Sequence, residues 1–406
     1  ILPIILPSQK CSSLHKIILA YFGKNKNNYI LLISYKANCT NSENSLCYKN
    51  TLSINKFMNL HENKQDFQDL INLTSQYLQL EEIYIEKDYF VVLALKNLAL
   101  SEHKQNGIFK GGTSLSKVFR VIKRFSEDID IAVVKDNGVD RGSPNQVKAI
   151  EKALTSHQCF DINESDTHRT EKLRKIVCNY PRIGQNNNYG QIHSHINIDI
   201  SRIMPGVPFE EKSITCYIHD YLKDNSNQTV IDEYDLNEIK VNTLRMERTF
   251  VEKIIALANY STLSHKGLEP IERLKKGIRH IYDLHQMLQE EPVKEFSKGM
   301  AKIENKNIQE FIDKVLQQDL DGMRQNDEYQ SFINSDFSQC ILYNKPDEIW
   351  EKLEQTYNGE FKRILFGSAS LPNPQDIIGS LQEVRKVCED FNNWKITNNR
   401  VYQRSV

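Results

Sequence analysis

Residues 107–134 read GIFKGGTSLSKVFRVIKRFSEDIDIAVV, and this stretch says more about the fold than any other. Its apolar start predicts a short strand at 107–110, and the glycine pair that follows predicts a turn. A helix is expected at 113–122 and a buried strand at 128–134. Strand, glycine turn, helix and strand in this order predict a mixed fold built around the turn.

Two aspartates and two glycines carry the chemistry of this stretch. Because side chains alternate along a strand, Asp128 and Asp130 point to one side while Ile129 points to the other. Two carboxylates on one face suit a divalent cation that prefers oxygen ligands, such as Mg²⁺ or Mn²⁺. Gly111 and Gly112 let the backbone approach a phosphate closely, because no side chain intervenes. The pattern predicts a metal ion held next to a polyphosphate.

A third carboxylate is expected from a second strand. Residues 195–201 read HINIDIS, in which isoleucines alternate with polar residues. Asn197 and Asp199 therefore share the face opposite the isoleucines. If this strand neighbours the strand of Asp128 and Asp130, Asp199 completes a set of three metal ligands. A solvated acid at a sheet edge is the alternative.

Length and composition fit a folded protein of two or three domains. The chain has 406 residues, of which 39% are hydrophobic and 26% charged, and its formal net charge is −1. A near-neutral chain has no overall attraction to nucleic acid, so contacts with RNA must come from local basic patches. No apolar run is long enough to form a membrane-spanning helix. We expect a cytoplasmic protein without a membrane partner.

The eight cysteines are scattered singly through the chain. None forms a Cys-x-x-Cys pair, and no spacing along the sequence predicts a zinc site. Single thiols in a chain of this size are typical of a reducing compartment. Buried or inert thiols are the expected outcome.

The pattern of residues divides the chain into three parts. Residues 1–57 are rich in Asn, Lys and Ser and lack periodicity, so we expect an atypical extension that precedes a natural start at Met58. In 58–240 strands alternate with helices, and 241–406 is expected to be helical, which predicts an α+β protein with a second, α-helical domain. Further helices are expected at 66–80, 85–100, 146–156, 246–260, 271–289, 293–305, 308–318, 345–357 and 374–391, and further strands at 175–180, 195–201 and 213–221.

The segments FKGGTSLSK at 109–117 and RFSEDID at 124–130 resemble the signature of the AbiEii/AbiGii toxin family. This family belongs to the DNA polymerase beta-like nucleotidyltransferases and contains bacterial toxins of toxin–antitoxin and phage-abortive systems. The resemblance covers most of 58–391 and implies a polymerase beta-like core, a small mixed sheet with flanking helices, plus a C-terminal helical domain. It implies metal-dependent transfer of a nucleoside monophosphate from an NTP to an acceptor, with release of pyrophosphate. An RNA acceptor, above all the 3′ end of tRNA, and an antitoxin encoded nearby are the expected partners.

The resemblance also assigns catalytic roles outside the two segments. Lys253 matches a helix lysine that the family uses near the nucleotide phosphates, where an ammonium would neutralise charge on the triphosphate. Asp283, in the sequence RHIYDL, matches an acidic residue that would oppose Lys253 or orient the acceptor, whereas His280 stands where relatives often carry an acid. Asp128 and Asp130 complete the expected catalytic set. The residues expected to contact the nucleotide are Gly111, Gly112, Thr113, Ser114 and Lys117.

Three adjacent charges, Glu86, Lys87 and Asp88, interrupt an apolar helical pattern. Charges in such a place predict an ion pair that caps a helix or positions one domain against another. Basic residues cluster near 110–124, 172–175 and 273–279. Such clusters are usually solvated faces, but next to a metal site they can also form a channel for an RNA end.

Two alternatives to RNA modification stay open. The enzyme can instead transfer the nucleotide to a hydroxyl of a protein or of a small molecule. The protein can also be a nucleotide-binding interaction module without turnover. A large helical half and several basic clusters favour a macromolecular acceptor, and the presence of every expected catalytic residue favours an enzyme over the module.

Overall fold

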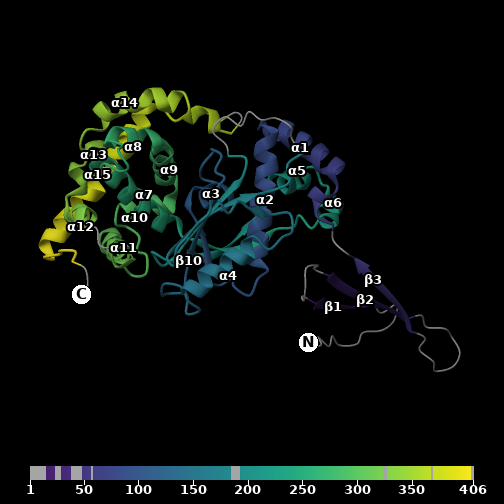
Figure 1. Ribbon diagram of the computed structural model, residues 1–406. Coiled ribbons are helices and arrows are strands. Elements are labelled where there is room, and N and C mark those ends of the chain that lie inside the picture. Colours follow the sequence, from purple (N-terminus) through teal and green to yellow (C-terminus); the bar gives the residue numbers. More distant parts are fainter. Residues whose placement is uncertain are drawn as a thin grey trace.

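The computed structural model describes residues 15–22, 29–37, 48–55, 58–183, 193–322, 327–366 and 369–403 (Figure 1). Within the extension that the sequence set apart, three strands pair as an antiparallel meander in the order β1-β2-β3. They are β1 (His15–Phe22), β2 (Tyr29–Ala37) and β3 (Tyr48–Asn55). The lack of an obvious alternating pattern hid these strands from the sequence analysis.

A mixed eight-stranded sheet forms the centre of the next part of the chain, in the order β10-β11-β4-β5-β9-β8-β6 with β7 paired to β8. The pairs β5–β9 and β11–β4 are parallel, and the remaining pairs are antiparallel. The α+β class with a mixed sheet is therefore confirmed. The strands are β4 (Gly107–Lys110), β5 (Ile129–Val133), β6 (Asp161–Ile162), β7 (His168–Arg169), β8 (Leu173–Asn179), β9 (Ile196–Ser201), β10 (Phe209–Ile214) and β11 (Ile239–Leu244).

Helices on one side of this sheet bury its apolar face (Figure 1). The long helix α2 contributes Phe90 and Leu95 to a core that also contains Ile131 of β5 and Ile198 of β9. Because alternate residues of a strand face the same layer, the aspartates of these strands are left on the opposite face. The helices of this part are α1 (Lys64–Leu78), α2 (Glu82–Ala99), α3 (Gly111–Lys117), α4 (Pro144–Leu154), α5 (Tyr217–Asp224) and α6 (Gln228–Glu233).

From Met246 onward the described residues form helices and no named strand, so the expected helical half is present. Its core includes Phe250, Tyr282 and Phe311, and it also takes in Leu115 and Ile122 from the region of the glycine turn. The core of the helical half thus extends into the region of the glycine turn, while the sheet keeps a separate main core. The helices are α7 (Met246–Thr262), α8 (Pro270–Lys276), α9 (Ile278–Gln289), α10 (Glu291–Ser297), α11 (Ile308–Gly322), α12 (Asp327–Asn334), α13 (Ile341–Asn344), α14 (Pro346–Asn358) and α15 (Pro374–Thr397).

Several expected elements differ from the structure. The helix expected at 113–122 begins at Gly111 and ends at Lys117, and the helix expected at 293–305 already ends at Ser297. The strand expected at 213–221 is wrong, because β10 ends at Ile214 and α5 begins at Tyr217, where the Cys216 side chain accepts a hydrogen bond from the backbone N–H of His219. The single helix expected at 271–289 is two helices joined at Gly277. A Cβ on Gly277 would lie 2.8 Å from the ring of Tyr260, so the joint depends on a close approach that only glycine allows.

The division of the chain at 240 remains a proposal. The last strand of the sheet, β11, runs to Leu244 and so continues past that position. Its pairing with both β10 and β4 makes it part of the sheet. A boundary just before α7 fits the elements better.

Candidate active site

The glycine turn is packed directly against the strand of aspartates. Gly111 has a φ of +79°, and a Cβ added to it would lie 2.1 Å from Oδ2 of Asp130. A Cβ on Gly112 would lie 2.7 Å from the Arg124 guanidinium and 2.9 Å from the Ser126 hydroxyl. Gly111 therefore brings the turn's backbone close to the Asp130 carboxylate, and Gly112 brings it close to the Arg124 and Ser126 side chains.

The three aspartates that the sequence analysis selected come together on one face of the sheet. In the parallel pair β5–β9, Asp130 is in register with Asp199. Asp128 lies just before β5, and its Oδ1 accepts a hydrogen bond of 3.1 Å from the Asn197 amide on β9. Lys175 Nζ lies 3.1 Å from Oδ2 of Asp199. The intervening isoleucines are buried and the three carboxylates are partly exposed, as the alternation predicts.

The electrostatics of this face fit a divalent cation. Burial, together with the neighbouring charges of Asp128 and Asp199, raises the pKa of Asp130 to about 6, although Lys110 and Arg279 oppose the shift. Mutual repulsion among carboxylates is what a bound cation relieves. Three carboxylates form the oxygen-rich donor set that Mg²⁺ and Mn²⁺ prefer.

Three further polar groups of the turn bond to the protein itself. The buried hydroxyl of Thr113 donates to the Asp128 carbonyl at 2.6 Å, and the buried hydroxyl of Ser114 donates to the Gly111 carbonyl at 2.9 Å. Lys117 forms a buried ion pair of 2.6 Å with Asp88 on α2. These groups stabilise the turn through bonds within the protein, and their contact with a nucleotide remains a prediction.

A buried charged cluster links the sheet to the helical half. Asp283 on α9 accepts two hydrogen bonds from Arg124, of 2.6 and 2.7 Å, and a third of 2.8 Å from Lys253 on α7. Burial would raise the pKa of Asp283, but the two cations outweigh it and hold that pKa well below its usual range. His280 Nδ1 lies 3.0 Å from Lys253 Nζ. The expected opposition of Lys253 and Asp283 is thus seen as a direct ion pair.

Helix α2 supports the site through its three adjacent charges. The Glu86 carboxylate accepts a hydrogen bond from the backbone N–H of Ile183. Lys87 pairs with Glu127, next to Asp128, at 2.6 Å. Asp88 pairs with Lys117 at the end of α3 and also accepts from the backbone N–H of Tyr217. These are positioning contacts, of the kind that the interrupted apolar pattern indicated.

Two residues from the basic cluster at 110–124 also belong to the site. Arg124 is the bidentate partner of Asp283, and Lys110 lies in register with Asp130 in the β4–β5 pair. Lys110 Nζ also lies 2.8 Å from Glu252 on α7. Each pairing joins residues far apart in the chain, so local spacing carried no signal for it.

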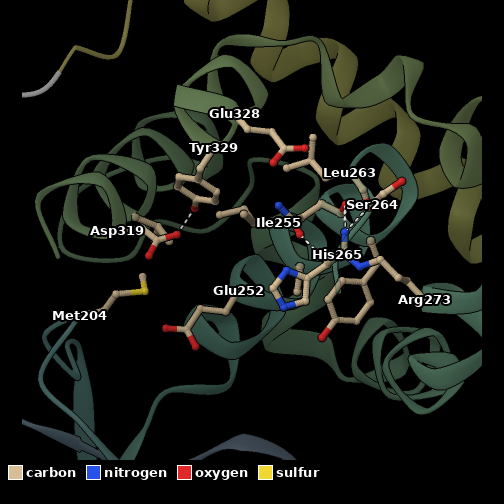
Figure 2. Close-up of a pocket in the computed structure, with 14 residues that line it drawn as sticks. Met204, Glu252, Ile255, Leu263, Ser264, His265, Arg273, Asp319, Glu328 and Tyr329 are labelled. Carbon is tan, nitrogen blue, oxygen red and sulfur yellow. Dashed lines mark hydrogen bonds between the residues drawn. The ribbon is translucent and has the colours of Figure 1, made fainter. Parts of the chain in front are cut away.

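A cavity of about 530 Å³ opens beside this cluster, between helices α7, α11 and α12 (Figure 2). Two contacts connect it to the site: Glu252 on its wall bonds to Lys110, and the ring of Tyr260 lies 5.9 Å from that of His280. Its wall combines apolar and aromatic side chains with a few polar groups. The lining includes Met204, Ile255, Ala256, Asn259, Leu263, His265, Arg273, Val315, Asp319, Glu328 and Tyr329.

A glycine turn packed against Asp130 of β5, with Asp128 just before that strand and a third carboxylate on the neighbouring strand, is the arrangement expected of a nucleotidyltransferase fold. Residues 93–367, more than half of the chain, match the family described as nucleotidyl transferase AbiEii toxin, type IV toxin–antitoxin system. The chain belongs to this family, which confirms the resemblance seen in the sequence. It is therefore a nucleotidyltransferase toxin, and its family implies a cognate antitoxin. Comparison with curated proteins and with solved structures gave no match.

None of the helices in the described residues is long and apolar enough to cross a membrane.

Proposed function

We propose that this enzyme transfers a nucleoside monophosphate from an NTP to an RNA, at the 3′ end of tRNA, with release of pyrophosphate. The observation that carries the proposal is the convergence of Asp128, Asp130 and Asp199 on one sheet face next to the glycine turn. The backbone of Gly111 and Gly112 would receive the triphosphate. Adding a nucleotide to the tRNA 3′ end would stop translation, which would explain why the protein is toxic and why an antitoxin is encoded nearby. Such an activity in the cytoplasm would also suit defence against phage.

The three aspartates would hold Mg²⁺ or Mn²⁺. When bound, such an ion neutralises charge on the α-phosphate and lowers the pKa of an attacking hydroxyl. Lys253 would place positive charge beside the triphosphate and the departing pyrophosphate, and Asp283 keeps that ammonium oriented. Catalysis then rests on positioning and charge rather than on a covalent intermediate.

We further propose that the cavity beside α7 receives the nucleoside of the NTP. Its volume lies in the range of small-molecule sites, and its rings at Tyr260 and His265 offer apolar faces to a base. Lys110 spans the two regions, because it is in register with Asp130 and bonds to Glu252 on the cavity wall. Exposed Lys123, Lys276 and Arg279 are then left to attract the acceptor RNA.

Incubation of the purified protein with magnesium, each α-labelled NTP in turn and total tRNA tests the reaction. We expect label on tRNA that disappears in Asp128→Ala and persists in Asp140→Ala, which removes an exposed aspartate outside the site. Label on a protein or on a small molecule would identify that class of molecule, and not RNA, as the acceptor. Growth arrest that persists in Asp128→Ala would instead support a non-catalytic binding module.

The cavity has its own test, the substitution Ala256→Phe, which would fill part of it. We expect the KM for the NTP to rise about 10-fold or more, because a filled pocket loses the contacts of a nucleoside, while kcat changes less. Ala301→Phe, on a helical-half residue outside the cavity, is the control. An unchanged KM with folded protein would show that the nucleoside binds elsewhere.

A further inference from the structure

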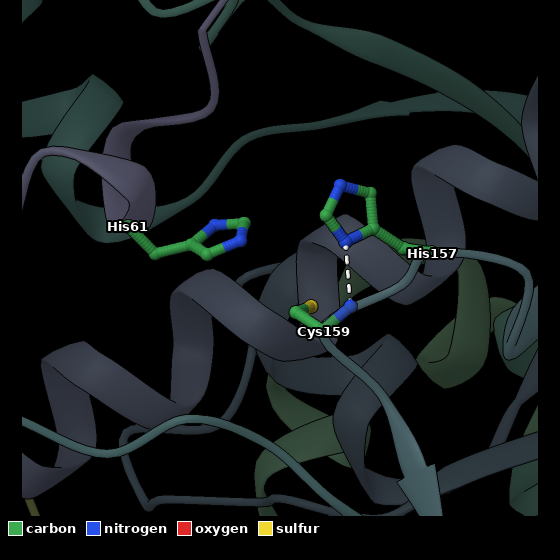
Figure 3. A group of neighbouring side chains, drawn as sticks. All are labelled: His61, His157 and Cys159. Atoms are coloured by element: carbon green, nitrogen blue, oxygen red, sulfur yellow. Dashed lines mark hydrogen bonds between the residues drawn. The ribbon is translucent and has the colours of Figure 1, made fainter. Parts of the chain in front are cut away.

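Outside the catalytic region, two histidines and a thiol converge from distant parts of the chain (Figure 3). His61 belongs to the short 3₁₀ helix Leu60–Glu62, whereas His157 and Cys159 follow α4. One ligand atom from each lies within 4.8 Å of the other two. We propose that these three residues bind a zinc ion.

The donor set and its surroundings fit this metal. Two imidazoles and one thiolate are ligands that zinc prefers, and a tetrahedral ion would hold them about 3.3–3.7 Å apart, so modest side-chain rotation closes the site. His61 Nδ1 lies 2.9 Å from the Tyr89 hydroxyl, which leaves Nε2 for the metal. An outer partner of this kind orients histidine ligands in zinc sites. His157 Nε2 lies 3.0 Å from the Asn59 side-chain nitrogen, and its Nδ1 accepts a hydrogen bond of 3.2 Å from the Cys159 backbone N–H.

Binding would change the protonation of the thiol. Zinc would displace the Cys159 thiol proton as the sulfur–metal bond forms, releasing one proton per ion bound. The His157 Nδ1 would exchange its hydrogen bond from the Cys159 backbone N–H for the metal.

Such an ion would have a structural role. It would fasten the segment that leads into α1 to the loop between α4 and β6, and water would be the fourth ligand, as in zinc sites with three protein ligands. The ligands lie far apart in sequence, which is why spacing along the chain gave no zinc signature. The inference does not depend on the proposed reaction.

Cobalt serves as the probe, because thiolate-bound Co²⁺ has a near-ultraviolet charge-transfer band that carboxylate-bound Co²⁺ lacks. The reduced full chain, freed of metal by a chelator, is titrated with Co²⁺ in excess Mg²⁺ and then with Zn²⁺. We expect one equivalent to give this band, zinc to displace it, and zinc to raise the melting temperature. Tyr89→Phe should weaken zinc binding about 10-fold, as the loss of an outer partner does.

Two ligand variants and one control make the outcome decisive. Cys159→Ser should abolish the band, and Cys340→Ser, in the helical half, should leave it intact. If Cys159→Ser does not fold, His157→Asn replaces it and should lower zinc affinity at least 10-fold. No band in the folded wild type, or a band that survives both ligand variants, would overturn the proposal.

Discussion

At the scale of single residues, Gly111 is the position where the site tolerates least change. Gly111→Ala would place a Cβ 2.1 Å from the Asp130 carboxylate, so that carboxylate must move. We expect transferase activity to fall by at least 100-fold, because moving a carboxylate that we propose to hold the metal by about 1 Å disrupts the reacting geometry. The measurement is nucleotide incorporation under saturating NTP, with circular dichroism to confirm the fold.

Gly267→Ala is the matched control for this substitution. Gly267 has a φ of +75°, close to that of Gly111, but a Cβ there would meet nothing within 4 Å. Both variants carry the same backbone cost of about 1–2 kcal/mol, so only the clash differs between them. Equal activities in the two variants would show that the position of the Asp130 carboxylate does not require a glycine at position 111.

A site residue could be predicted from the sequence where the pattern that indicates it lies within a few neighbouring residues. Asp128, Asp130 and Asp199 were found because alternation along a strand is visible in a few residues, and the register of β5 with β9 then brought them together. Arg124 was not assigned to Asp283, because that pairing joins α9 to a segment far away in the chain. The convergence of His61 with Cys159 escaped for the same reason.

At the scale of elements, α2 ties the glycine turn to the sheet through buried ion pairs. Removing one partner of such a pair leaves an uncompensated charge, so Lys117→Met should lower the free energy of unfolding by about 3–5 kcal/mol. Asp88→Asn should have a similar effect. The double variant should lose less free energy of unfolding than the two single variants lose together, because it leaves neither charge unpaired. Urea unfolding of the wild type, the two single variants and the double variant measures the coupling.

The exposed pair Lys345–Glu348 provides the comparison for this cycle. Both side chains are more than half exposed, 57% and 64%, so solvent screens their interaction and the coupling should stay below about 1 kcal/mol. A coupling for Lys117 and Asp88 no larger than that of the exposed pair would refute the positioning role of α2.

Elements were predictable where one periodicity dominated. Helix α15 and strand β9 carry clear helical and alternating patterns, and both lie close to their expected positions. The region around α5 was not predictable, because buried Ile214, Cys216 and Ile218 alternate as in a strand although only the first belongs to β10. The capping bond of Cys216, rather than the alternation, decides where the helix starts.

At the scale of the whole molecule, the two halves are joined by more than one kind of contact. Leu115 and Ile122 are part of the core of the helical half, and Arg124 forms an isolated bridge with Leu365. The buried pair between Arg124 and Asp283 adds a charged link at the same place. Such continuity predicts that the sheet and the helices unfold together, even though the sequence suggested two domains.

The two tryptophans make this cooperativity measurable, because Trp350 and Trp394 both lie in the helical half. Ile198→Ala would leave a cavity in the core of the sheet, at a cost of about 2–5 kcal/mol. If the halves unfold as one unit, this distant substitution should shift the tryptophan fluorescence transition in urea as much as the circular dichroism transition. Leu316→Ala, in the helical core, should likewise shift both signals together. A tryptophan transition unmoved by Ile198→Ala would mean that the packing of Leu115 and Ile122 and the Arg124 contacts do not couple the halves.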